Sequence, residues 1–123
     1  MELKCRIWVE DENRNRIMGE GVIALLRGID ETRSINRAAA GLKMSYRNAW
    51  GKIEKTEARL DTRLVERTVG GSHGGGSRLT PQGRAWLEAF DNLHRDLDSI
   101  RSELCDRHLS GINGDASPAS PSG

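Results

Sequence analysis

The sequence has few aromatic residues, few cysteines and no long apolar run. Aromatic residues make up only 4% of the 123 residues, and no apolar run approaches the ~20 residues that a helix needs to cross a bilayer. The first residues lack the apolar segment of a secretory signal. The two cysteines, Cys5 and Cys105, are too few and too far apart for the framework of a small disulfide-rich domain. These absences predict a soluble cytoplasmic protein with two reduced thiols.

The chain also lacks a strong excess of charge of either sign. Its 19 Lys and Arg residues against 18 Asp and Glu residues give a formal net charge of +1. Taken for the whole chain, this value argues against a strongly basic nucleic-acid binder. With 30% charged and 36% hydrophobic residues, the composition is that of a single soluble domain rich in helix.

Alternating polar and apolar residues predict a β-hairpin over about the first 18 residues. Cys5, Ile7 and Val9 are predicted to share one face of the first strand. Residues 11–15 form a polar, turn-prone stretch, and residues 16–18 begin the return strand. We therefore expect a small β element ahead of the first helix.

Three helices are predicted between residues 22 and 60. In each of them, apolar or small residues recur at helical spacing and so form one buried stripe. Ser34 and Ser45 are the predicted N-caps of the second and third helices, and residues 31–33 are a predicted link. The stripes are Val22, Leu25, Leu26 and Ile29, then Ile35, Ala38, Ala39 and Leu42, then Ala49, Ile53, Thr56 and Leu60. Two short helices joined by a short turn are typical of a helix-turn-helix, although the spacing fits a helical hairpin of a small bundle equally well.

The next segment favours the helix-turn-helix. Residues 64–69 are predicted as a strand and residues 78–80 as its return strand, joined by the glycine-rich stretch 70–77. Two strands with a glycine-rich tip, directly after a helix-turn-helix, form a wing. Thr80 as N-cap and Pro81 at the first helical position then begin another helix. The predicted fold class is mainly α with small β: a winged helix-turn-helix with an N-terminal β-hairpin and a long C-terminal helix.

The last predicted helix runs from about Pro81 to Leu109, and its apolar residues are spaced 4, 3, 4, 3 and 4 residues apart. This is the heptad spacing of a helix that packs on a partner helix. A helix of ~43 Å, at ~1.5 Å per residue, exceeds what so small a domain can cover, so we predict a homodimer; packing within the monomer is the alternative. We expect one domain over residues 1–110, with dimerisation helix 81–109, and a disordered tail over residues 111–123. The predicted seam residues are Trp86, Phe90, Leu93, Leu97, Ile100 and Leu104.

Positive charge is concentrated around the predicted helix-turn-helix and wing. Residues 33–84 contain eleven Lys and Arg residues against four Asp and Glu residues, a net charge of +7, whereas residues 91–123 contain three against six, a net charge of −3. Basic residues that neutralise the phosphates of a duplex release counterions. The distribution therefore predicts a double-stranded DNA partner, bound with an affinity that falls steeply as salt is added.

Base recognition is predicted for the N-terminal half of the third helix. Arg47 has the donors for a bidentate contact with guanine, and Asn48 can pair with adenine or serve the helix cap. Ser45 can cap the helix and contact a phosphate, and Trp50 is predicted either to pack under the first helix or to lie edge-on to the DNA. For any single basic residue, a solvated surface charge is an equal alternative. The predicted DNA-binding residues are Ser34, Arg37, Ser45, Tyr46, Arg47, Asn48, Lys52, Lys55, Arg67, Ser72, His73 and Arg78.

No pattern in the sequence predicts an enzyme, a metal site or a cofactor. The glycine-rich stretch leads into Arg78 and not into the Gly-Lys-Ser/Thr end of a P-loop. His73, His94 and His108 are scattered, and no Cys or His spacing is typical of metal ligands. We therefore predict no catalytic residues, no metal and no cofactor.

Two segments together strongly resemble the N-terminal domain of the molybdate-dependent transcriptional regulator (ModE) family, a winged helix-turn-helix related to the LysR type. The segments are SINRAAAGLKMSYRNAW at residues 34–50 and GGSHGGGSRLTPQG at residues 70–83. The resemblance covers roughly residues 4–109, and its LysR-like portion is residues 64–67 with residues 78–83. It implies a bacterial homodimer, joined through the long helix, that binds a palindromic operator with the third helix and the wing.

The chain departs from the family pattern in two respects. Full-length members continue after the long helix into molybdate-binding domains, for which this sequence has no counterpart, so we expect no site for molybdate or another oxyanion. Thr56 stands where the LysR-like pattern has an apolar residue. The sequence thus predicts a single-domain, sequence-specific DNA-binding transcriptional regulator. The alternative is a protein–protein interaction module whose long helix heterodimerises with a larger regulator or antagonises it.

Overall fold

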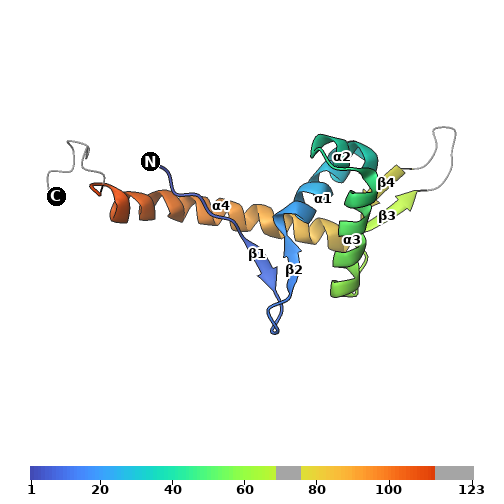
Figure 1. Cartoon of the computed structure of the whole chain (residues 1–123), viewed down its shortest axis with the longest axis horizontal. Coiled ribbons are helices and arrows are strands. Elements are labelled where there is room, and N and C mark those ends of the chain that lie inside the picture. The colour runs from blue at the N-terminus through green and yellow to red at the C-terminus, as the bar shows by residue number, and fades with distance from the viewer. Residues whose placement is uncertain (69–75, 113–123) are drawn as a thin grey trace. The chain divides into compact units, whose positions relative to one another are not determined.

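The computed structural model describes residues 1–68 and 76–112, and the chain divides into two compact units (Figure 1). One unit contains residues 6–90, and the other contains residues 1–5 with the chain from residue 91 onward. The elements in chain order are β1 (Trp8–Glu10), β2 (Arg16–Gly19), α1 (Glu20–Thr32), α2 (Ile35–Gly41), α3 (Tyr46–Leu60), β3 (Val65–Thr68), β4 (Gly76–Leu79) and α4 (Pro81–Leu109). This is the predicted winged helix-turn-helix with an N-terminal hairpin and a long last helix.

The N-terminal hairpin is shorter than predicted. β1 begins at Trp8, which pairs with Gly19, the last residue of β2. Because α1 begins directly after Gly19, β2 has no further residue to pair with the chain before Trp8. The backbone N–H of Ile7 instead donates to a carboxylate oxygen of Glu20 at 2.9 Å. Cys5, predicted to share a strand face with Ile7, is exposed and belongs to the other unit, so that prediction is wrong.

The core of the unit formed by residues 6–90 surrounds α1. This helix runs to Thr32, so most of the predicted link at residues 31–33 is helical, and Arg33 ends the helix with a left-handed φ of 62°. The backbone N–H of Arg33 donates to the carbonyl oxygen of Ile29 at 2.7 Å. The buried residues of α1 are Val22, Ile23, Leu25, Leu26 and Ile29, and fully buried partners from other segments include Met18, Ile53, Leu64, Val65 and Phe90.

α1 and α2 pack closely because small residues meet where they touch. A Cβ atom on Gly28 of α1 would lie only 2.7 Å from the Cβ of Ala38 on α2. Such a distance is shorter than any van der Waals contact, so this position requires glycine. The run of small residues at 38–41 predicts a close helix approach, and the structure confirms it at Ala38, while the sequence does not single out Gly28.

The three predicted N-caps are confirmed. In each, a side-chain hydroxyl accepts a hydrogen bond from the backbone N–H three residues later, at 3.0 Å, and so satisfies one of the unpaired groups of the first helical turn. The pairs are Ser34 with Arg37 on α2, Ser45 with Asn48 on α3, and Thr80 with Gly83 on α4.

A buried carboxylate ties β3 to α3. Glu57 is 9% exposed, and one oxygen of its carboxylate accepts hydrogen bonds from the backbone N–H groups of Leu64 at 2.8 Å and Val65 at 3.2 Å. Glu57 thus joins the buried face of α3, whereas Leu60, predicted for that face, is only half-buried. An apolar pattern cannot reveal this arrangement, because it arises from contacts with a later segment of the chain.

The two wing strands pair antiparallel, with Glu66 opposite Arg78 and Arg67 opposite Ser77. Their positions agree with the predicted strands to within two residues. The predicted DNA-binding residues Ser72 and His73 lie outside the described residues. The same holds for the predicted tail beyond residue 112.

α4 has the predicted bounds, but its predicted seam is divided. Phe90 is fully buried in the core of the unit formed by residues 6–90, and Trp86 packs against that core half-buried. The seam residues in the other unit are more accessible than Phe90. They are Leu93 (44% exposed), Ile100 (49% exposed) and the half-buried Leu97 and Leu104. Among the described residues, no helix has both the length and the apolar character that crossing a membrane demands.

Candidate nucleic-acid interface

α3 turns one face to the core and leaves the opposite face open. Ala49 and Ile53 are fully buried, while Arg47, Asn48 and Gly51 are exposed. Apart from the adjacent residues and the backbone of α3 itself, no described atom lies within 4 Å of the place where a Cβ on Gly51 would stand. A helix with an unobstructed face that carries a guanidinium and an amide near its N-terminus has the donors and acceptors to read base edges in a major groove.

Most of the predicted DNA-binding residues are exposed on the unit formed by residues 6–90. Ser34 is half-buried and its hydroxyl caps α2. Asn48 contributes only its backbone N–H to the cap of α3, so the capping group is Ser45 and the exposed side-chain amide of Asn48 is left for base contact. The exposed residues are Arg37, Ser45, Tyr46, Arg47, Asn48, Lys52, Lys55, Arg67 and Arg78.

The wing is joined to α3 by an arginine stacked on aromatic rings. The Cζ atom of Arg67, on β3, lies 4.5 Å from the ring centroid of Trp50 and 5.9 Å from that of Tyr46. The Arg67 guanidinium also donates a hydrogen bond to the hydroxyl of Tyr46. A guanidinium over an aromatic face is attracted by the ring quadrupole. The contact therefore holds a wing cation beside the N-terminal half of α3.

The same contact involves Trp50. The indole is half-buried and packs against the hydrophobic core, while Arg67 covers its ring. Packing under the first helix in particular and an edge-on contact with DNA both stay predictions. Tyr46 and Trp50 are four residues apart and so share one side of α3, which is the sequence signal for this stacking site.

Arg78 is held by an ion pair across the wing. Its Nε lies 3.1 Å from a carboxylate oxygen of Glu66, the residue opposite it in the β3–β4 pairing. Both side chains are well exposed, at 61% and 49%, and such pairs contribute little to stability. Arg78 can therefore exchange this carboxylate for a phosphate at small cost.

Some surface groups have shifted pKa values. The backbone N–H of Asn15 lowers the pKa of Asp11 by hydrogen bonding, and the hydrogen bond with Asp30, at 2.6 Å, raises the pKa of Arg84. These are surface groups, unlike the buried carboxyls and histidines of proton-transfer sites. In residues 1–68 and 76–112, no group of three or more His, Cys, Asp or Glu side chains is placed to hold a metal ion.

The curated proteins similar to this chain include several that are named ModE. The chain is 38% identical over 73 residues to the transcriptional regulator ModE of Haemophilus influenzae, which is 59% of this chain and 29% of that protein. It is 36% identical over 93 residues to the molybdenum transport protein ModE of Azotobacter vinelandii, 76% of this chain and 34% of that protein. It is 37% identical over 71 residues to the DNA-binding transcriptional dual regulator ModE of Escherichia coli K12, 58% of this chain and 27% of that protein. The chain thus spans about a third of the length of these relatives.

Solved structures share the fold. The DNA complex of the CbnR DNA-binding domain matches with a TM-score of 0.53 and 25% identity, over 71% of this chain and 99% of that one. The complex of the BenM DNA-binding domain with benA site 1 DNA matches with a TM-score of 0.57 and 22% identity, over 76% of this chain and 99% of that one.

The sequence model of the bacterial regulatory helix-turn-helix proteins of the lysR family matches residues 22–84, which include both helices of the helix-turn-helix and both wing strands. The chain therefore belongs to the LysR family of bacterial regulatory helix-turn-helix proteins.

Proposed function

We propose that this chain is a sequence-specific DNA-binding transcriptional regulator that binds a palindromic operator as a homodimer. The observation that carries the proposal is the open face of α3, with Arg47 and Asn48 at its N-terminal end and the wing cation Arg67 stacked beside it. The family match and the DNA bound to the similar domains in the solved complexes support it. The family is one of DNA-binding regulators, and we propose no catalytic role for the chain.

In the proposed mechanism, contacts with phosphates and contacts with bases have different roles. Cations on α2, α3 and the wing contact phosphates and fix the register of the protein on the duplex, while base edges supply the sequence information. Arg47 is suited to the two acceptors of guanine, and the side-chain amide of Asn48 to the acceptor and donor of adenine. Arg67 and Arg78 extend from the wing strands toward phosphates or a minor groove.

The dimer is proposed to form along the residues of α4 beyond residue 90. Leu93 and Ile100 are exposed at 44% and 49% and are seven residues apart, so they lie on one side of the helix. Burying them against the same residues of a second copy removes apolar area from water. A two-fold dimer presents two copies of α3 to two half-sites, and such a protein requires an operator with matching two-fold symmetry.

A selection from random duplexes tests this function. The full chain is incubated at low salt with a library of duplexes that contain a randomised central segment, and retained DNA is sequenced over several rounds. We expect an inverted repeat whose half-sites lie about one or two helical turns apart. Retention of no duplex above the level of a protein-free control would overturn the proposal.

The proposal also includes the cellular location of the protein and the absence of molybdate binding. As a regulator of a bacterial chromosome, the protein is proposed to act in the cytoplasm. We also expect no site for free molybdate within this chain, although some relatives are named for molybdenum transport. Equilibrium dialysis of the full chain against molybdate is expected to show no saturable binding, and tight stoichiometric binding would contradict this expectation.

A further inference from the structure

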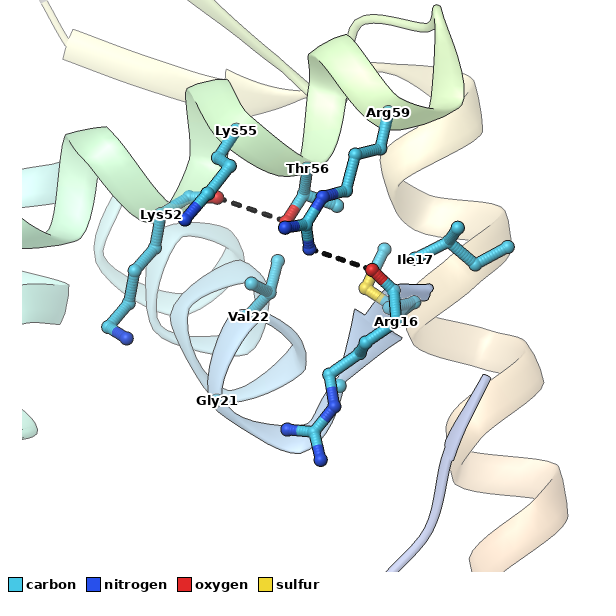
Figure 2. Close-up of a pocket in the computed structure, with 10 residues that line it drawn as sticks. Arg16, Ile17, Gly21, Val22, Lys52, Lys55, Thr56 and Arg59 are labelled. Atoms are coloured by element: carbon cyan, nitrogen blue, oxygen red, sulfur yellow. Dashed lines mark hydrogen bonds between the residues drawn. The ribbon is translucent and has the colours of Figure 1, made fainter. Parts of the chain in front are cut away.

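A basic pocket lies between α3, the strand β2 and the first turn of α1 (Figure 2). It has a volume of about 230 Å³, and none of its ten lining residues is acidic. A water molecule needs only ~10–15 Å³ of such volume, so an oxyanion of five heavy atoms fits. Four of the lining residues are basic: Arg16, Lys52, Lys55 and Arg59.

The pocket occupies the side of α3 that is turned away from the wing contact. Lys52, Lys55 and Arg59 recur at i, i+3 and i+7 and therefore lie on one side of the helix. Tyr46 and Trp50, which hold the wing arginine, recur at i and i+4 on another side. In Figure 2, the side chains of Lys55 and Arg59 reach from α3 into the space above Val22 and Gly21 of α1.

Local contacts fix the walls of the pocket. A guanidinium nitrogen of Arg59 donates to the backbone carbonyl oxygen of Arg16 at 2.7 Å, which ties β2 to α3 (Figure 2). The guanidinium of Arg16 stacks on Trp8, with its Cζ atom 4.5 Å from the ring centroid. The hydroxyl of Thr56, buried between them, donates to the carbonyl oxygen of Lys52 at 3.0 Å. The Arg59 contact thus holds two walls of the pocket together, and the Arg16 guanidinium lies over Trp8, which lines a neighbouring pocket with Glu20.

The electrostatics of this space favour an anion. Four positive side chains around one pocket repel one another, and an anion between them turns the repulsion into attraction. The first turn of α1 adds the positive end of a helix dipole, which the Glu20 carboxylate in that turn partly offsets. The chemistry that fits is a phosphate group, which accepts charge-assisted hydrogen bonds from Lys and Arg.

We propose that this pocket binds a phosphate group of the DNA backbone, at the edge of the groove that α3 enters; the inference rests on the function proposed above. A helix is about 10–12 Å wide and a major groove about 12 Å wide, so a helix in the groove has a phosphate backbone along each of its two sides. The wing arginine Arg67 contacts the phosphates on one side. The phosphates on the other side are contacted by the pocket cations Arg16, Lys52, Lys55 and Arg59. Arg16 and Arg59 are new members of the interface, because the sequence does not single them out for DNA contact.

The test compares two variants that lose the same charge. Arg16→Gln/Lys55→Gln removes two pocket cations and keeps the backbone oxygen that Arg59 binds. Arg95→Gln/Arg107→Gln removes two exposed cations from α4 and is the matched control. The affinity of each full-length variant for a selected duplex and for a scrambled one is measured by fluorescence anisotropy across roughly 50–200 mM salt, after circular dichroism has shown native helix content.

The slope of log affinity against log salt reports the number of phosphates neutralised. We expect the pocket variant to bind both duplexes more weakly by the same factor and to lose about two units of slope, one for the pocket of each protomer, while the control keeps the wild-type slope. If both variants keep that slope, the pocket does not contact DNA and the inference fails, although the proposed function stands. If the unaltered chain binds neither duplex, the function itself fails.

Inorganic phosphate without DNA distinguishes the two sources of the phosphate group. The amide resonances of Gly21 and Val22 are followed by nuclear magnetic resonance as phosphate is added to the full chain. We expect only weak, non-saturating shifts, because the pocket is open and the duplex holds its phosphate in place. Saturable binding that the pocket variant abolishes, together with an unchanged salt slope on DNA, would overturn the DNA contact in favour of a site for a free oxyanion.

Discussion

At the scale of single residues, one arginine does two things in the free protein. Arg67 packs its guanidinium on Trp50 and hydrogen-bonds Tyr46, and it also places a positive charge next to the helix that is proposed to read bases. Lysine could supply the charge but not the planar stacking. The identity of this residue therefore affects both the stability of the wing and the binding of DNA.

Replacing this arginine tests its structural part. Arg67→Ala is expected to lower the free energy of unfolding by about 0.5–1 kcal/mol, the size of an exposed cation–π contact, in urea titrations followed by circular dichroism. The same substitution at the exposed Arg63 is the control, with an expected change within about 0.5 kcal/mol. Equal effects at the two positions would show that the stacking contributes nothing specific.

A second residue prediction concerns base reading. Arg47→Ala is expected to relax specificity by ~1–3 kcal/mol at one base step, because the lost guanidinium no longer distinguishes guanine from other bases. The measurement is the affinity for the selected duplex and for single-base variants of it. If the variant weakens binding to selected and scrambled duplexes equally, Arg47 contacts a phosphate and not a base.

At the scale of elements, the sequence predicts the helices better than their contacts. The caps at Ser34, Ser45 and Thr80 are confirmed because a cap is a local hydrogen bond between residues three apart. The buried Glu57 and the stacked Arg67 escape prediction because their partners are distant in the sequence or come from another element. The exposed residues of α3 follow from helical spacing, whereas their contact with DNA stays a prediction, as it does for Ser72 and His73.

Glu57 anchors the wing, and its charge is expected to matter. Glu57→Gln weakens two backbone hydrogen bonds to a charged acceptor, so we expect the protein to lose about 1.5–3 kcal/mol of unfolding free energy. The exposed Glu54, one turn earlier on α3, gives the control Glu54→Gln, with an expected change within about 0.5 kcal/mol. The stability of both variants is compared by calorimetry or urea unfolding. If the Glu57→Gln protein is as stable as the control, the Glu57 carboxylate does not anchor the wing.

Replacement by alanine is expected to have opposite effects at two helix glycines, one at the α1–α2 contact and one on the open face of α3. Gly28→Ala is expected to destabilise the protein by about 1–3 kcal/mol, because the new methyl group collides with Ala38. Gly51→Ala, in the middle of α3 with open space around it, is expected to stabilise by about 0.5–1 kcal/mol. Thermal unfolding of the two variants measures both, and stabilisation by Gly28→Ala would show that the helices can separate without strain.

At the scale of the whole molecule, α4 contributes to both compact units. Its first turns complete the core through Leu87 and Phe90, while Leu93 and Ile100 remain exposed on later turns. The heptad pattern alone cannot make this division, because Phe90 fits the seam as well as its neighbours do. Only the position of the core relative to the helix shows which seam residues are already buried within their own chain.

The proposed dimer is tested along the accessible part of the seam. Leu97→Asp places a charge among apolar residues, so sedimentation is expected to show a monomer with native helix content. Ser102→Asp, at an exposed position of the same helix, should leave the mass of the dimer unchanged. If the Leu97→Asp protein keeps the mass of a dimer, the seam residues pack within one chain and do not form the dimer interface.

The burial of Phe90 within its own chain has a consequence for how the regulator responds to its abundance. A protomer that completes its core without a partner can stay folded when the proposed dimer dissociates, so we expect dilution to yield folded single copies and not unfolded chains. Two such copies must then meet before one operator is filled. Below the dissociation constant of the dimer, occupancy rises with the square of the protein concentration, and a modest change in synthesis becomes a sharper change in promoter activity.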